Sequence, residues 1–281
     1  MKKIIVVTGA SSGMGASFAR QLAKESAGFL QRGKTQAASD EIWIVARRKD
    51  RLEALKKEIE GLGEGIPFVR VIDMDISGRD GARALGKIFS DEASAEGSSE
   101  GSVFINVLVN NAGFGTYGEF AETDVEREME MVDLDCTSLT GITGYALPFM
   151  GKGSRLINTA SLASFLPLGN FAVYGACKAY VLSLTVALAA ELKQKGIRVT
   201  ALCPGPVSTE FANVASRGAR KEVKHGLSAE KTVAHCIKKS RRGSLYALMA
   251  FKWKIASWAS KLVPRYICAW FTYKFNKRPS N

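Results

Sequence analysis

A strand, a glycine-rich loop and a helix open this chain, and their order constrains the fold more than any other feature. Residues 3–7 form a short apolar run, residues 8–15 read Thr-Gly-Ala-Ser-Ser-Gly-Met-Gly, and residues 16–23 have a helical pattern. Glycines in such a loop let backbone N–H groups approach a phosphate at the helix N-terminus, where unpaired amides favour anions. The alternative is an ordinary tight turn. Because this is the first strand-to-helix turn of the chain, it predicts a nucleotide site.

Further apolar segments follow the same plan. Residues 41–46, 68–75 and 104–113 each contain an apolar run of β type, and the last two end in polar residues. Strands that alternate with helical patterns predict a parallel sheet with right-handed crossovers, and ligands bind beyond the carboxyl ends of its strands. We therefore expect an α/β fold, a single doubly wound parallel sheet with helices on both faces. Asp75 and Asn111 are expected to face a nucleotide.

Two arginines, Arg47 and Arg48, stand where the second predicted strand ends. A nicotinamide-binding βαβ unit presents its cofactor selector at this point. A carboxylate would accept a hydrogen bond from a free 2′-hydroxyl, whereas arginine pairs with a 2′-phosphate. The arginines therefore predict NADP(H). The alternative is that they merely begin a solvated helix with Lys49 and Arg51.

Ser161, Tyr174 and Lys178 have the order and spacing expected where a phenol serves as an acid at neutral pH. A tyrosine with a pKa near ~10 gives up its proton usefully only if a cation stabilises the phenolate, and a lysine four residues later lies on the same helical face. Residues 155–161 predict a buried strand ending at the serine, and residues 172–192 predict a buried helix. The three residues therefore predict carbonyl chemistry.

The same spacing occurs a second time, in Ser260, Tyr273 and Lys277. Spacing alone is therefore not diagnostic. The second set lies in a basic aromatic stretch, whereas Ser161 stands at the end of a predicted strand, where an active-site serine belongs. We expect no catalytic role for the second set.

The composition fits one large α/β domain, since the chain has 281 residues, of which 46% are hydrophobic and 23% charged. The five cysteines are widely separated and include no CxxC or metal-spaced pair, so reduced thiols and no metal site are expected. The apolar run before Thr8 is too short for a signal-peptide core, and the longest uncharged run, Leu156 to Cys177, is too polar to span a membrane. We expect a cytoplasmic protein.

Five motifs in this chain resemble those of the short-chain dehydrogenase/reductase family. They are Thr8–Gly15, Asn110–Gly113, Ser161, Tyr174 with Lys178, and Pro204–Thr209. The resemblance spans residues 3 to about 210 and implies a Rossmann-type sheet of about seven strands and NAD(P) binding. It implies a homodimer or homotetramer built through helices near 123–150 and 171–195. Residues 1–210 would form the NADP-binding and catalytic core, and residues 211–281 a helical substrate lid of the same domain.

The resemblance also implies roles for individual residues. Tyr174 would donate a proton to the carbonyl oxygen while hydride arrives from the nicotinamide, Ser161 would hydrogen-bond the same oxygen, and Lys178 would lower the phenol pKa and hold the nicotinamide ribose. The glycine loop would border the pyrophosphate and its riboses through Gly9, Ser11, Ser12, Gly13, Met14 and Gly15. The remaining cofactor contacts would be Arg47, with Arg48 beside it, at the 2′-phosphate, Asp75 and Ile76 at the adenine, Asn111, Ala112 and Gly113 at the adenosine ribose, and Pro204, Gly205, Val207 and Thr209 at the nicotinamide amide.

One position departs from the family pattern. Asp135, thirteen residues before Pro148, stands where the proton relay usually has an asparagine. An aspartate there would hold a water toward Lys178 and favour its ammonium form. The alternative, with equal weight, is that Asp135 caps a helix or lies on its solvated face.

The last part of the chain is basic and aromatic. Residues 214–281 hold 16 Lys or Arg against two acids, so their net charge of +14 exceeds the +12 of the whole chain. One alternative is a helix pair that packs its apolar face over the substrate cleft. The other is peripheral contact with an anionic membrane. No motif supports nucleic-acid binding. The residues concerned are Phe251, Ile255, Trp258, Leu262, Tyr266, Ile267, Trp270 and Phe271, among Lys252, Lys254, Lys261, Arg265, Lys274, Lys277 and Arg278.

These features together predict an NADP(H)-dependent oxidoreductase that interconverts a ketone and a secondary alcohol on a hydrophobic small-molecule substrate. The layout of the tail resembles family members that act on long-chain 3-oxoacyl groups or steroids, and sphingoid substrates belong to the same class. The direction of the reaction is not in the sequence. A function of another class is a catalytically silent NADP-binding scaffold attached to membranes or partners through its tail. The intact Ser161, Tyr174 and Lys178 argue against it.

Overall fold

The computed structural model describes the chain except for residues 95–102, 221–222, 224–225, 261, 279 and 281. The side chains at 251, 252 and 256 also lie outside the described part. The expectations for Phe251, Lys252 and Lys261 therefore fall on residues whose side chains are not described.

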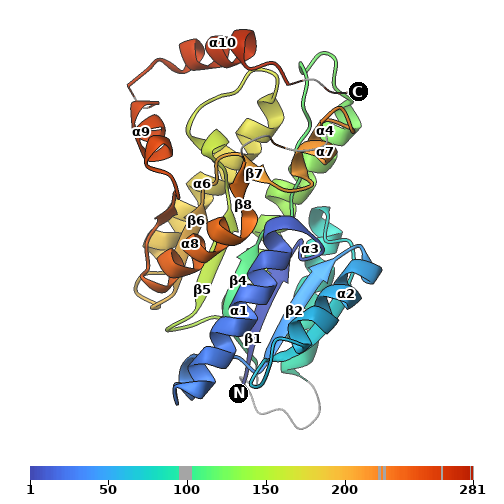
Figure 1. Cartoon of the computed structure of the whole chain (residues 1–281), viewed down its shortest axis with the longest axis vertical. Helices are drawn as coiled ribbons and strands as arrows, with labels where there is room; N and C mark the ends of the chain where they lie inside the picture. Colours follow the sequence, from blue (N-terminus) through green and yellow to red (C-terminus); the bar gives the residue numbers. More distant parts are fainter. Residues whose placement is uncertain (95–102, 221–222, 224–225, 261, 279, 281) are drawn as a thin grey trace.

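A seven-stranded parallel sheet in the order β3-β2-β1-β4-β5-β6-β9 forms the centre of the molecule (Figure 1). Strand order reverses between β1 and β4, and a parallel sheet binds ligands beyond its carboxyl ends at such a point. The strands are β1 (Lys2–Thr8), β2 (Glu41–Ala46), β3 (Phe68–Asp73), β4 (Val103–Asn110), β5 (Arg155–Thr159), β6 (Arg198–Leu202) and β9 (Tyr246–Ala247), with a separate parallel pair β7 (Val207–Ser208) and β8 (Leu227–Ser228).

Helices connect the strands, and most of them are α-helical. They are α1 (Gly13–Gln31), α2 (Lys49–Glu60), α3 (Gly78–Ala93), α4 (Val125–Val132), α5 (Leu139–Ala146), α6 (Ala172–Glu191), α7 (Phe211–Ala215), α8 (Ala229–Arg241), α9 (Phe251–Ala259) and α10 (Arg265–Phe275). Shorter 3₁₀ segments are η1 (Thr35–Ala37), η3 (Leu147–Phe149) and η4 (Leu162–Phe165), and η2 (Asp133–Ser138) is a π-helical turn between α4 and α5.

The core has two halves, one on each face of the sheet. Successive side chains of a strand point to opposite faces, so Ile5 and Val7 of β1 pack with α1, α2 and α8, while Ile4 and Val6 pack with α3 and α5. The helices α1 and α8 lie in front of the sheet in Figure 1. The predicted doubly wound α/β fold is confirmed, with seven strands in the main sheet.

The helix α6 joins β5 to β6 and contacts both strands. Among the described helices it alone is long and apolar enough to cross a membrane. Because it packs on the sheet and carries Tyr174 and Lys178, we treat it as a core helix.

The tail helices α9 and α10 lie at the end of the molecule to which the carboxyl ends of the strands point (Figure 1). Two hydrogen bonds with α10 and a third from Arg278, which follows it, hold the tail to the loop before α6. Gly169 N donates to Thr272 Oγ1 (2.9 Å), Asn170 Nδ2 donates to Tyr273 O (2.9 Å), and Arg278 Nη1 donates to Gly169 O (3.2 Å).

The large apolar side chains of this helix pair are exposed, contrary to the first of the two expectations for it. Trp258 is 65% exposed and Tyr266 80% exposed. The reason is close packing beneath α10: a Cβ at Gly169 would lie 2.6 Å from Tyr273 Cα, so only small side chains fit between helix and loop. The pair therefore does not pack its apolar face over a cleft.

Candidate active site

The glycine loop brings bare backbone to the start of α1. Gly9 has φ +65°, and a Cβ there would lie 2.7 Å from Ala112 Cα, at the end of β4. A Cβ at Gly15 would collide with Gly9 O. Only glycine leaves room for this path, and the result is an open helix N-terminus of the kind that holds a phosphate.

Thr8 and Asn111 fasten the loop to the neighbouring strand. Thr8 Oγ1 accepts hydrogen bonds from the N–H groups of Asn111 (3.0 Å) and Ala112 (3.1 Å), and Asn111 Nδ2 donates to Thr8 O (3.2 Å). The amide of Asn111 therefore shapes the crevice between β1 and β4, at the place where the sequence predicts a nucleotide. Its predicted contact with the adenosine ribose stays a prediction.

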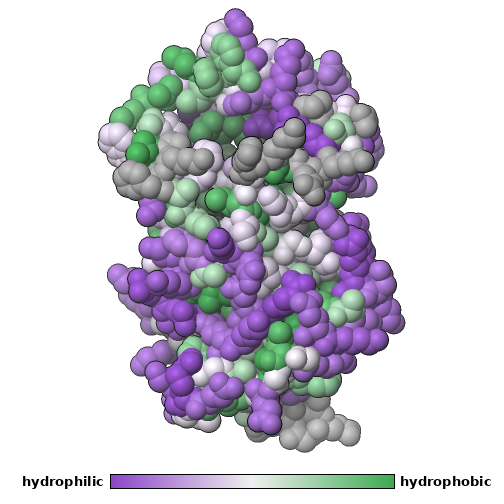
Figure 2. Space-filling model, in the orientation of Figure 1, coloured by the Kyte–Doolittle hydropathy of each residue, from purple (hydrophilic) through white to green (hydrophobic). Residues whose placement is uncertain are grey.

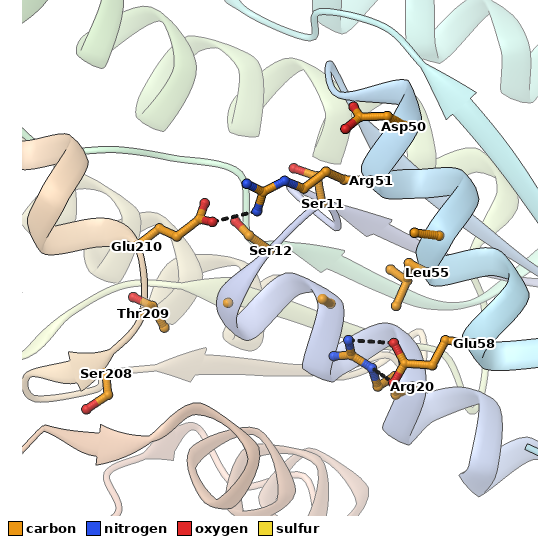
Figure 3. Close-up of a pocket in the computed structure, with 13 residues that line it drawn as sticks. Ser11, Ser12, Arg20, Asp50, Arg51, Leu55, Glu58, Ser208, Thr209 and Glu210 are labelled. Atoms are coloured by element: carbon orange, nitrogen blue, oxygen red, sulfur yellow. Dashed lines mark hydrogen bonds and ion pairs between the residues drawn. The ribbon is translucent and has the colours of Figure 1, made fainter. Parts of the chain in front are cut away.

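A pocket of about 520 Å³ lies beside the loop (Figure 3). The loop, the first turns of α1, one side of α2 from Asp50 to Glu58, and β7 with the segment after it line the pocket. Its walls include Ser11, Ser12, Gly13, Arg51, Thr209 and Glu210. Hydroxyl groups, a glycine loop and an arginine fit the phosphate end of a dinucleotide.

Arg48, rather than Arg47, turns toward the loop. Arg48 Nη2 donates to Ser11 Oγ (3.0 Å) and to Ser12 Oγ (2.9 Å). Arg47 has a side chain 72% exposed, with its Nη1 3.7 Å from Asp75 Oδ2. Arg47 therefore fits the alternative of a solvated residue at the start of a helix, whereas Arg48 does not.

Glu210 is a residue of this site that sequence reasoning missed. Its carboxylate pairs with Arg48 (Nη1 to Oε2, 3.1 Å) and with Arg51 (Nη1 to Oε1, 2.5 Å), and Figure 3 shows it reaching across the mouth of the pocket. The hydrogen bonds of these arginines lower the pKa of Glu210, which keeps it ionised. Glu210 directly follows the predicted cofactor segment Pro204–Thr209, and this position could have indicated that it belongs to the site.

The other predicted cofactor residues lie along the same edge of the sheet. Asp75 and Ile76 follow β3, where Asp75 Oδ1 accepts from Ser77 N (2.9 Å) and Ile76 is buried. Thr209 lies against Gly13, with its methyl 3.2 Å from the position of a Cβ there. Further members are Met14, which lies in the first turn of α1 and packs on the core, Gly113, which packs against Asp135, Gly205, which packs against Trp253, and Pro204 and Val207, which lie between β6 and α7.

Ser161, Tyr174 and Lys178 come together as predicted. Ser161 follows β5, and its side chain hydrogen-bonds the phenol of Tyr174. Lys178 lies one turn after Tyr174 in α6, with Nζ 5.6 Å from the ring centroid. Ser161 Oγ also accepts from Ala163 N (3.1 Å), so its O–H is the group that donates to the phenol.

Asp135 pairs directly with Lys178, and no water stands between them. Lys178 Nζ lies 2.8 Å from Asp135 Oδ2 and donates to Thr159 O at 3.2 Å, while Asp135 Oδ1 accepts from Phe114 N at 3.0 Å. The Asp135 side chain is fully buried, which excludes a solvating role, and it sits in the π-helical turn η2. Such turns are frequent at functional sites.

The ionisation of the phenol reflects two opposing effects. Burial raises the pKa of Tyr174, while the charge of Lys178 and the hydrogen bond of Ser161 act in the opposite direction. Burial alone would lower the pKa of Lys178, but the carboxylate of Asp135 reverses this and raises it, so Lys178 stays an ammonium. Lys178 therefore acts on the phenol in the expected direction, and burial outweighs it.

Aromatic rings surround Tyr174. Phe171 stacks on it with ring centroids 4.0 Å apart, Phe211 lies at 5.4 Å, and Tyr117 packs edge-on against Phe171 at 4.8 Å. The guanidinium of Arg278 lies 5.0 Å above the Phe171 ring. Sequence reasoning did not single out this aromatic wall, because its members come from three separate segments.

The second set with the same spacing does not form a site. Ser260 Oγ donates to Ser257 O (2.9 Å), and Tyr273 is 47% exposed and hydrogen-bonds Glu119. Within the described residues no group of three His, Cys, Asp or Glu side chains is placed to hold a metal ion.

Comparison with known families gives a match over most of the chain. A family profile described as short chain dehydrogenase matches residues 3–220. A sulfoacetaldehyde reductase from Chromohalobacter salexigens is 32% identical over 222 residues, which are 78% of this chain and 78% of the relative.

Solved structures resemble the whole molecule. A short-chain dehydrogenase from Sphingobium yanoikuyae in complex with NADPH has a TM-score of 0.72 and 25% identity, covering 92% of this chain and 94% of that one. A bulky-bulky ketone specific alcohol dehydrogenase from Comamonas testosteroni has a TM-score of 0.68 and 25% identity, covering 92% of each chain.

Proposed function

This chain belongs to the short-chain dehydrogenase/reductase family, and from that premise we propose that it interconverts a ketone and a secondary alcohol on a hydrophobic substrate with NADP(H). The family makes it an oxidoreductase that uses a nicotinamide cofactor. The observation that carries the finer proposal is a phenol, held by Ser161 beside Lys178, inside an aromatic wall.

Tyr174, Ser161 and Lys178 each have a separate role in the proton transfer. A bound nicotinamide cofactor supplies or accepts the hydride. Tyr174 donates its proton to the carbonyl oxygen in reduction and, as phenolate, accepts it back in oxidation. Ser161 turns its O–H from the phenol to the same oxygen and stabilises the charge that develops there. Lys178, kept protonated by Asp135, stabilises the phenolate left behind.

The preference for NADP(H) is proposed from Arg48 and Arg51. Arg51 lines the pocket beside the glycine loop, and Arg48 hydrogen-bonds two hydroxyls of that loop, those of Ser11 and Ser12. A 2′-phosphate offers a dianion in place of the single charge of Glu210. The solved relative from Sphingobium yanoikuyae binds NADPH, which agrees with this preference.

Replacement of each arginine tests this preference. Arg48→Leu should weaken NADPH binding about tenfold or more and leave NADH binding unchanged, because it removes a charge-assisted contact to the 2′-phosphate alone. Arg47→Leu is the matched control and should change little. Cofactor fluorescence titration gives both constants. Equal NADPH affinities for the parent and Arg48→Leu would exclude Arg48 as the selector.

A hydrophobic ketone is proposed as substrate because of the wall around Tyr174. Phe171, Phe211 and Tyr117 offer apolar area and few groups that would replace the hydration of a polar substrate. The relative from Comamonas testosteroni is described as specific for bulky-bulky ketones, in agreement with this. Long-chain 3-oxoacyl thioesters, ketosteroids and keto-sphingoid bases form the panel for a screen that follows NADPH absorbance.

Tyr174→Phe separates the enzyme from the silent-scaffold alternative. The variant keeps the ring that stacks on Phe171 but lacks the proton, so NADPH oxidation by any accepted ketone should fall by a factor of about 10² or more. NADPH binding should stay within about twofold, because the hydroxyl donates to the substrate. Unchanged turnover would exclude Tyr174 as the acid, and no turnover by the parent on the whole panel would favour the scaffold.

We propose self-association through the helices that follow β4 and β5. A groove of about 630 Å³ runs between α3, η2, α5 and α6, and exposed apolar side chains border it at Val132, Tyr145 and Tyr180. A second copy would cover them. Light scattering should give the mass of a dimer or tetramer, and Tyr145→Glu should lower it.

We propose a cytoplasmic location, since all five cysteines are free thiols in the structure. Reduced thiols are the usual state in that compartment.

A further inference from the structure

Helix α10 turns its large apolar side chains to solvent and its small side chains to the protein, which is unusual for a helix on a protein surface in water. The small residues Cys268, Ala269 and Thr272 face inward, and the large apolar residues face solvent. A surface helix normally does the reverse. Of the 21 exposed large apolar side chains among the described residues, ten lie between Ile255 and Phe275.

Helix α9 continues the same surface. Trp253 and Ser257 turn inward, where a Cβ at Gly205 would lie 2.6 Å from Trp253 Nε1, so this face of α9 is seated on the protein. Ile255 (52% exposed) and Trp258 (65% exposed) turn outward. We call the outward side chains of Trp258, Leu262, Tyr266, Ile267, Trp270 and Phe271 the tail surface. Figure 2 shows hydrophobic residues gathered along the upper left edge, where Figure 1 places α9 and α10.

The charged side chains that α9 and α10 themselves carry are all cationic, and the acids Glu119 and Glu122 lie near Tyr273 on the inner side of α10. Lys254, Arg265 and Lys274 are exposed on the same two helices, and Lys274 Nζ lies 5.0 Å from the centroid of the Trp270 ring. No Asp or Glu follows Glu230 in the chain. Exposed tryptophan, tyrosine and aliphatic side chains among lysines and arginines are the pattern of a segment that lies in the interface of an anionic membrane.

We propose that the tail surface docks on an anionic lipid bilayer. The apolar side chains enter the boundary between headgroups and acyl chains, and the surrounding cations bind the lipid phosphates. A second copy of the chain fits this surface less well. A two-fold contact would set Lys254, Arg265 and Lys274 against the same two helices of the second copy, which carry cations and no carboxylate of their own. Nucleic acid would leave Leu262 and Ile267 without an apolar partner.

Docking would bring the bilayer next to the proposed active site. Helix α10 is hydrogen-bonded to Gly169 and Asn170, and the next residue, Phe171, stacks on Tyr174. A hydrophobic ketone dissolved in the membrane would therefore have a short path to the phenol. This last step rests on the proposed function, whereas docking itself does not.

Sedimentation with lipid vesicles tests the proposal on the full chain. The protein should bind vesicles of phosphatidylcholine mixed with phosphatidylglycerol, bind vesicles of phosphatidylcholine alone at least about tenfold more weakly, and lose affinity as salt is raised. Trp258 and Trp270 should shift their fluorescence to the blue and be quenched by brominated lipid, whereas the buried Trp43 should not contribute.

Two pairs of matched variants identify the surface. Trp258→Ser with Tyr266→Ser should weaken binding about tenfold or more, whereas Phe68→Ser, which removes a 58% exposed ring at the sheet edge, should not. Lys254→Glu with Arg265→Glu should weaken it as much, whereas Lys193→Glu with Lys195→Glu, the same charge change beyond α6, should have a small effect.

Further results would separate docking from the enzymatic proposal or overturn it. Tyr174→Phe should bind vesicles like the parent, so loss of the enzymatic proposal leaves docking intact. Equal binding by the tail variants and their controls would overturn the proposal. It would also be overturned if the tail variants lowered the oligomeric mass in the absence of lipid, or if duplex DNA or RNA bound to the tail while vesicles did not.

Discussion

At the scale of single residues, the buried pair of Asp135 and Lys178 sets the electrostatics of the site. Asp135 raises the pKa of Lys178, and its negative charge also raises the pKa of Tyr174. The aspartate therefore has two opposing effects. It holds the cation that stabilises the phenolate, and it repels the phenolate itself.

Asp135→Asn should move the pH dependence of alcohol oxidation to lower pH. Oxidation needs the phenolate, so its rate rises as pH passes through the pKa of Tyr174, which burial sets above the ordinary value. Tyr174 also favours the ammonium form of Lys178, so the cation stays beside the phenolate when the carboxylate is removed. The repulsion by Asp135 is then lost, the pKa of Tyr174 falls, and the rising limb of kcat/KM should shift to lower pH. Asp133→Asn, at an exposed position of the same π-helical turn, is the control. Superimposable profiles for Asp135→Asn and the parent would remove Asp135 from the mechanism.

At the scale of the elements, one buried carboxylate joins three of them. Glu25 of α1 pairs with Arg155 of β5 (Nη2 to Oε2, 2.7 Å) and with Arg241 of α8 (Nε to Oε1, 3.2 Å). The side chains of Glu25 and Arg155 are only 8% and 6% exposed. Removing one partner leaves the other charge in a poorly solvated site, which costs far more than losing a surface pair.

Glu25→Gln should lower the free energy of unfolding by about 3 kcal/mol, because it leaves Arg155 buried without its counter-charge. The control is Asp91→Asn, which breaks an exposed pair with Lys87 and should cost less than about 0.5 kcal/mol. Urea denaturation followed by far-UV circular dichroism measures both. Similar losses for the two variants would show that the Glu25 pair does not stabilise the packing of α1 and α8.

At the scale of the whole molecule, the tail is attached to the core through the loop that leads into α6. The loop backbone at Gly169 approaches α10 so closely that a side chain would strike Tyr273. The attachment therefore depends on the absence of one methyl group and on hydrogen bonds from Gly169 and Asn170.

Gly169→Ala should release α10 while the core stays folded. A Cβ there would lie 2.6 Å from Tyr273 Cα and 2.8 Å from Tyr273 N, so the helix must move away. Trypsin should then cut faster after Arg265 and Lys274, while the urea midpoint of the core changes little. Gly144→Ala is the control, because a Cβ there meets nothing within 4 Å. Equal tail cleavage in the two variants would contradict the close packing.

The sequence by itself determined the sheet, the glycine loop and the meeting of Ser161, Tyr174 and Lys178. These features depend on local rules: a short apolar run marks a buried strand, four residues span about one helical turn, and parallel strands end at one edge. The same spacing recurs at Ser260, Tyr273 and Lys277, so the spacing predicts a site only where the serine follows a strand. The apolar run before Ser161 predicted that strand from the sequence.

Only the tertiary structure decided which distant residues meet. Arg48 rather than Arg47 faces the loop, Glu210 spans its mouth, and Asp135 binds Lys178 without a water. These pairs join segments far apart in the chain, and loop paths and close packing set their geometry. The sequence predicted an apolar face on the tail, but it left open whether that face is covered. Close backbone packing beneath α10 leaves it exposed, because only small side chains fit there.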